Sequence, residues 1–199
     1  MSRPLLAAAA LLLAFAFAVA AASASPAASD FIRKSCRATQ YPALCVQSLA
    51  SYGSPAPHSP RDLARAALSV SVDRARSASA YVGHLRIGGG GGGAVRDCLE
   101  NMADSVGHLR DAAAELGGNM GRAGSAGFRW HLSNVQTWCS AALTDENTCL
   151  DGLAVSRRGG GGGAGVDAAT RSAIRGKVVE VAQVTSNALA LVNRVAPNY

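Results

Sequence analysis

The sequence predicts an all-α protein, an antiparallel up-down-up-down four-helix bundle preceded by a short disulfide-stapled helical hairpin. Apolar residues recur at i, i+3 and i+4 along four long segments, the spacing of helices that pack along one face. Sustained period-2 alternation, which strands would show, does not occur. Glycine runs at 88–93 and 159–163 are long enough to join neighbouring antiparallel helices, because six flexible residues reach roughly 13 Å and packed axes lie about 8–10 Å apart.

Residues 1–25 have the pattern of a secretory signal peptide. Arg3 is followed by an uncharged apolar run, Leu5 to Ala22, and by small residues up to Ser25 that suit a cleavage site. The alternative is an uncleaved membrane anchor, since the run approaches the length that spans a bilayer. The small residues at its end, and the absence of basic residues just after it, favour the signal peptide and a mature protein without membrane contact.

Residues 26–58 form the predicted hairpin. Cys36 and Cys45 flank a Tyr41-Pro42 step, where a proline ends one helical segment and begins the next. A disulfide across so short a loop stabilises by about 2–3 kcal/mol in the chain-entropy model. Five cysteines in an oxidising compartment leave one unpaired, and neither C-x2-C spacing nor a histidine pair suggests zinc. They are Cys36, Cys45, Cys98, Cys139 and Cys149.

Residues 59–199 hold the predicted bundle. Its first helix begins at Ser59-Pro60, a serine N-cap followed by proline at the first helical position, and continues to about Leu85. Its second begins near Val95 and ends at Gly117-Gly118.

The remaining two helices complete one domain over 26–199. The third is expected over about 125–143, with Trp138 on its apolar arc, and the fourth over about 167–195, with Pro197 as its stop. The other members of the apolar arc of the third helix are Phe128, Leu132, Val135, Cys139 and Ala142.

Composition argues against several function classes. The net charge is +6, yet the arginines are scattered and no basic run alternates with aromatic residues, so we expect no nucleic-acid partner. A basic secreted protein would instead be attracted to anionic matrix.

No catalytic constellation is found. G-x-S-x-G and H-E-x-x-H are absent. The histidines are isolated in sequence, so neither a metal nor another cofactor is expected: His58, His84, His108 and His131. Cys139 lies on an apolar arc, which favours a buried thiol over a nucleophile. We therefore expect a protein that is not an enzyme.

Four motifs, in this order, resemble the plant invertase and pectin methylesterase inhibitor family. They are Cys36-x8-Cys45 with Tyr41-Pro42 inside it, Asp97 to Val106, Val135 to Thr144, and Thr148 to Leu153. The resemblance covers roughly 30–195. It implies the hairpin and bundle, the disulfides Cys36–Cys45 and Cys98–Cys149, and Cys139 as the odd cysteine.

The resemblance also implies a function in the plant cell wall (apoplast). Family members reversibly cover the active-site cleft of pectin methylesterase or of invertase. Invertase inhibitors carry a Pro-Lys-Phe element before the third bundle helix, whereas Gly117 to Phe128 here contains neither proline nor lysine. The chain is thus closer to the pectin methylesterase inhibitors, and its positive charge would favour association with anionic pectin. The alternatives are an invertase inhibitor and a non-inhibitory structural or interaction protein of the cell wall.

One helix face is the predicted contact with the target enzyme. No Asp, Glu, Lys or Arg occurs from Trp130 to Thr144, and a face of small uncharged polar residues costs little free energy to dehydrate at the centre of an interface. The competing interpretation is that the hairpin or another helix of the same chain covers this face. The predicted contact residues are Ser133, Gln136, Thr137, Ser140 and Thr144.

Overall fold

A computed structural model describes residues 26–50, 57–87, 92–155 and 166–196. Within these ranges every regular element is a helix, and no strand occurs. The predicted signal peptide, the run 159–163 and Pro197 lie outside the described residues. No described helix is long and apolar enough to cross a membrane. The helices are α1 (Pro26–Cys36), α2 (Pro42–Ala50), α3 (Pro60–Ile87), α4 (Gly93–Gly117), α5 (Ala126–Val155) and α6 (Ala168–Val192).

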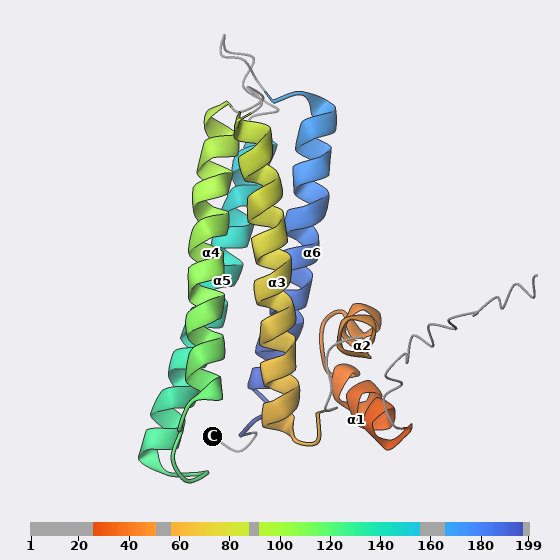
Figure 1. Cartoon of the computed structure of the whole chain (residues 1–199), viewed down its shortest axis with the longest axis vertical. Helices are drawn as coiled ribbons and strands as arrows, with labels where there is room; N and C mark the ends of the chain where they lie inside the picture. Colours follow the sequence, from red (N-terminus) through yellow and green to blue (C-terminus); the bar gives the residue numbers. More distant parts are fainter. Residues whose placement is uncertain (1–25, 51–56, 88–91, 156–165, 197–199) are drawn as a thin grey trace, which may run out of the picture.

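Helices α3 to α6 run alternately up and down and form the four-helix bundle (Figure 1). Each packs against its two neighbours in the order α3, α4, α5, α6 and back to α3, so α3 and α5 lie diagonally opposite each other. The core is built from aliphatic side chains of all four helices, exemplified by the fully buried Leu68, Leu109, Val135 and Val181. The predicted all-α bundle is confirmed.

Helix α3 begins and helix α4 ends where the sequence predicts. The Asp62 N–H donates to the Ser59 Oγ at 3.1 Å, and the Ser59 hydroxyl donates to the Asp62 carboxylate at 2.8 Å, which caps the start of α3. At the same end of this helix pair, the Arg61 guanidinium in the first turn of α3 donates to the Leu116 carbonyl oxygen at 2.9 and 3.0 Å. Arg61 thereby satisfies a carbonyl at the C-terminus of α4, where a cation is also favoured by the helix dipole.

The predicted end of α5 is wrong, and two other predicted boundaries are shifted by a few residues. Helix α5 continues past residue 143 to Val155, α6 ends at Val192 rather than 195, and α4 begins within the glycine run at Gly93. The continuation of α5 buries Cys149 and Leu153, and this gain in apolar burial outweighs the polar composition of 144–148.

Trp138 also departs from the prediction. It is half-buried at the edge of the core rather than enclosed in it. The other residues of the predicted apolar arc are buried.

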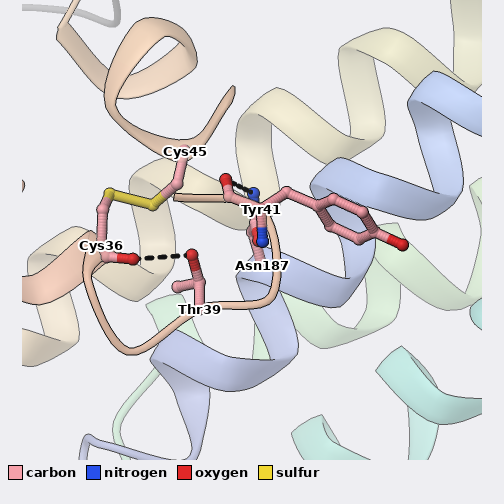
Figure 2. Close-up of a disulfide and its surroundings, with 5 residues drawn as sticks. All are labelled: Cys36, Thr39, Tyr41, Cys45 and Asn187. Carbon is pink, nitrogen blue, oxygen red and sulfur yellow. Dashed lines mark hydrogen bonds between the residues drawn. A yellow bond between two sulfur atoms is a disulfide. The ribbon is translucent and has the colours of Figure 1, made fainter. Parts of the chain in front are cut away.

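The hairpin packs against the lower part of α3 and α6 (Figure 1). The Cys36–Cys45 disulfide joins α1 to α2, with 5.7 Å between the Cα atoms, and Thr39 donates a hydrogen bond to the Cys36 carbonyl oxygen at 2.8 Å. Figure 2 shows Asn187 of α6 beside the turn between the two short helices. The Tyr41 N–H donates to the Asn187 Oδ1 and the Asn187 Nδ2 donates to the Tyr41 carbonyl oxygen, both at 3.0 Å.

Candidate functional site

The predicted contact residues lie on α5, on the side away from the core. Ser133, Thr137, Ser140 and Thr144 are all exposed. The hairpin packs on α3 and α6 instead, so it does not cover this side of α5. Gln136 differs from the other four, because it is half-buried and donates a hydrogen bond to the Asn193 Oδ1 at 3.0 Å.

One further exposed hydroxyl, that of Thr148, extends the row. We call Ser133, Thr137, Ser140, Thr144 and Thr148 the hydroxyl stripe. Residues three or four apart on a helix are neighbours on its surface, so the five side chains form one line along α5.

Four of the five stripe residues use their hydroxyl protons within the helix. Thr137 donates to the Ser133 carbonyl oxygen at 2.9 Å, and Thr144 donates to the Ser140 carbonyl oxygen at 3.0 Å. Ser140 and Thr148 donate one turn back in the same way, at 2.9 and 2.8 Å. What these four residues present to a partner is therefore oxygen lone pairs and the threonine methyl groups, and they need donate no hydrogen bond to it.

Two carboxylates near the stripe are paired with histidines along the seam with α4. His108 lies 2.9 Å from the Asp145 carboxylate, and His131 lies 2.7 Å from the Glu115 carboxylate. Asn134 adds a hydrogen bond to Glu115 at 3.1 Å. The hydrogen bonds from His131 and Asn134 lower the pKa of Glu115. These pairs hold α5 against α4 and leave the stripe itself uncharged.

Trp130 is a candidate contact residue that the sequence analysis missed. Its side chain is 62% exposed, and it stands three residues before Ser133 on the same side of α5. Its ring meets the His131 ring edge to face, with centroids 4.9 Å apart. The sequence did contain a signal for this contact, because Trp130 has helical spacing to the polar residues Ser133 and Thr137 and not to the apolar arc. Exposed tryptophan is enriched among residues that anchor protein interfaces.

The other sequence candidates contribute no reactive centre in the described part of the chain. No group of three or more metal-ligating side chains occurs among the described residues. Cys139 is buried and unpaired, and burial raises the pKa of its thiol to about 12. The second disulfide joins Cys98 of α4 to Cys149 of α5, with 4.2 Å between the Cα atoms. The site is a surface rather than a cleft with catalytic groups.

The family model described as plant invertase/pectin methylesterase inhibitor matches residues 30–191. The chain belongs to this family. It is 43% identical over 175 residues to "Pectinesterase inhibitor 9" of Arabidopsis thaliana, an alignment covering 85% of this chain and 82% of that protein. It is 41% identical over 176 residues to a "21 kDa protein" of Daucus carota, with 86% of each covered.

A solved structure supports the fold independently. A mutant form of a pectin methylesterase inhibitor from Arabidopsis superposes with a TM-score of 0.56 at 20% identity, covering 79% of this chain and 92% of that one. The family name covers inhibitors of two kinds of enzyme, invertase and pectin methylesterase.

Proposed function

We propose that this protein inhibits pectin methylesterase by covering the active-site cleft of the enzyme in a reversible complex. The observation that carries the proposal is an exposed, uncharged hydroxyl stripe on a chain whose relatives at about 40% identity include named pectinesterase inhibitors. Inhibition by coverage needs a surface that dehydrates cheaply and no chemistry of its own.

The alternative target, invertase, receives less support from the site. The region from Gly117 to Phe128 lacks proline and lysine, and the aromatic residue at its end is turned inward. Phe128 is only 6% exposed, so its ring packs in the core and is not available to a partner. The relatives reported above give no support to a purely structural role.

We also propose that the protein acts outside the cell, in the cell wall. The apolar N-terminal run read as a signal peptide and the two disulfides support an oxidising compartment. The positive charge would favour a weak, non-specific association with anionic pectin. Retention on immobilised polygalacturonate that is lost at moderate salt would support that association, and absence of retention at low salt would contradict it.

The decisive experiment compares inhibition of a panel of pectin methylesterases and of invertases by the purified protein. Two variants, Ser140→Arg and Thr144→Arg, place a long charged side chain on the stripe. Each should raise the inhibition constant at least about 100-fold, because an unpaired charge would have to be desolvated at the interface. Ser77→Arg, at an exposed position on α3, is the matched control and should inhibit like the wild type.

Circular dichroism and thermal unfolding of all three variants would verify that the bundle is intact. Inhibition of invertase alone would overturn the proposed target. Full inhibition of pectin methylesterase by both stripe variants would overturn the proposed surface but leave the target in place.

A further inference from the structure

Glu146 is a carboxyl group enclosed in the centre of the bundle. Its side chain, on α5, is 0% exposed, whereas the side chain of the preceding residue, Asp145, reaches the surface. Ser105 of α4 donates to its Oε1 at 2.8 Å, and Thr185 of α6 donates to the same oxygen at 3.0 Å. Both hydroxyl residues are also fully buried. Three helices thus converge on one oxygen of this carboxyl.

The other oxygen, Oε2, is buried and has no hydrogen-bond partner among the described residues. Burying the ionised carboxylate in this way costs far more free energy than burying the neutral carboxyl, because neither a cation nor a full set of hydrogen-bond donors compensates its charge.

No cationic side chain is among the groups that act on Glu146. From α4 the facing group is the Ser105 hydroxyl, and from α6 it is the Thr185 hydroxyl. On α5 itself the Asp145 carboxyl is the titratable group whose charge acts on Glu146. The Glu146 charge in turn raises the pKa of the buried Cys139 thiol. His108 of α4 pairs with Asp145 at 2.9 Å, outside the core. Helix α3 lies diagonally across the bundle and is not packed against α5.

We propose that Glu146 is a built-in pH sensor of the fold, whose neutral form fits the core and whose ionisation weakens the packing of α4, α5 and α6. The contribution of Glu146 to the stability of the bundle is accordingly full in acid and is lost as the pH approaches neutrality. This inference concerns folding and stands whether or not the protein inhibits pectin methylesterase.

The direction of the effect follows from proton linkage. Burial raises the pKa of Glu146 from 4.5 to about 7, and the hydrogen bonds from Ser105 and Thr185 offset only part of that rise. A group that binds its proton more tightly in the folded state stabilises that state fully below its unfolded pKa. The contribution is lost between about pH 4.5 and about pH 7. Over this interval the folding equilibrium constant should fall on the order of 100-fold.

Other carboxyl groups act in the opposite sense. The pKa values of Glu115 and Asp167 are lowered, chiefly by hydrogen bonds from His131 and Thr170 respectively. Their contributions are therefore lost as the pH falls through the acid range, below the interval assigned to Glu146. A decrease of stability with rising pH between 4.5 and 7 is not produced by these two groups.

The test is urea unfolding at a series of pH values from about 4.5 to 8 for the wild type, Glu146→Gln and Glu100→Gln. The glutamine at 146 retains an oxygen that accepts from both hydroxyls but does not titrate. Glu100 is an exposed carboxyl of α4, so its replacement is the matched control. Histidines titrate in the same range, and the readout is therefore the difference between each variant and the wild type.

In the wild type and in Glu100→Gln, the folding equilibrium constant should fall on the order of 100-fold between about pH 4.5 and about pH 7. In Glu146→Gln, most of this fall should be absent. An equal decline in the wild type and Glu146→Gln would overturn the proposal. If Glu146→Gln does not fold, infrared spectroscopy of the wild type at about pH 6 decides. A protonated carboxyl band supports the proposal, because exposed carboxyl groups are ionised at that pH, and its absence overturns the proposal.

Discussion

The attachment of the hairpin to the bundle should depend on one side chain, Asn187. It is 3% exposed and exchanges two hydrogen bonds with the backbone of Tyr41, both at 3.0 Å. Replacing it by alanine leaves the Tyr41 N–H without a partner in a half-buried position, which costs about 1–3 kcal/mol. The Tyr41 carbonyl oxygen still accepts from the Cys45 N–H at 2.9 Å, so losing the Asn187 donor costs less free energy at this oxygen than losing the acceptor costs at the Tyr41 N–H. We therefore expect Asn187→Ala to lower the free energy of unfolding by about 2–3 kcal/mol.

A second substitution at the same position tests the direction of the hydrogen bonds. Asn187→Asp keeps an oxygen that accepts from the Tyr41 N–H but replaces the donor with another oxygen facing the Tyr41 carbonyl. It should therefore destabilise at neutral pH and recover part of the loss in acid, where the carboxyl can donate. Ser186→Ala is the matched control, because it removes only the exposed hydrogen bond to Gln40 at 3.0 Å and should change stability by less than about 0.5 kcal/mol.

Urea unfolding gives the stability of each variant, and hydrogen exchange at the Tyr41 amide reports the attachment directly. That amide should exchange faster in Asn187→Ala than in Ser186→Ala, since its acceptor is gone. A loss below about 0.5 kcal/mol in Asn187→Ala, with unchanged exchange at Tyr41, would refute the reasoning.

Three further outcomes are expected. Replacing Cys98 and Cys149 together by serine opens a cross-link with a sequence separation of 51 and should cost about 4 kcal/mol in urea unfolding; a loss below about 1 kcal/mol would argue against a stabilising cross-link. Arg61→Ala should cost about 1–2 kcal/mol, because the Leu116 carbonyl loses both hydrogen bonds; an unchanged urea midpoint would contradict this. Cys139 should resist a thiol reagent in the native protein and react only after unfolding, since it is fully buried; fast native labelling would contradict its burial.

The helices of the bundle could be predicted because their local signals agree with their packing. Ser59 precedes a proline at the start of α3, and Gly117 marks the end of α4. Between these signals the apolar spacing identifies the buried faces. The exposure of Ser133, Thr137, Ser140 and Thr144 could be predicted for the same reason, since these residues lie on the side of α5 opposite its apolar arc.

The second half of α5 could not be predicted from the same pattern. The polar run 144–148 resembles a loop, and Glu146 interrupts the apolar periodicity at a position that is fully buried. Its burial depends on Ser105 and Thr185, which lie on other helices and are 41 and 39 residues away in sequence. Asn187 was missed for a similar reason, because a buried asparagine on α6 makes sense only beside the backbone of the hairpin. Tertiary partners, not local propensity, decide both positions.

The inward-directed hydroxyl protons of the stripe have a consequence for kinetics. Ser140 and Thr144 donate their hydroxyl protons to backbone carbonyls, and no Asp, Glu, Lys or Arg lies between Trp130 and Thr144. Contacts made by such a surface are not screened by ions, because screening acts on charges. The lifetime of a complex formed through the stripe should therefore be nearly independent of ionic strength, and any dependence on salt should appear in the rate of association.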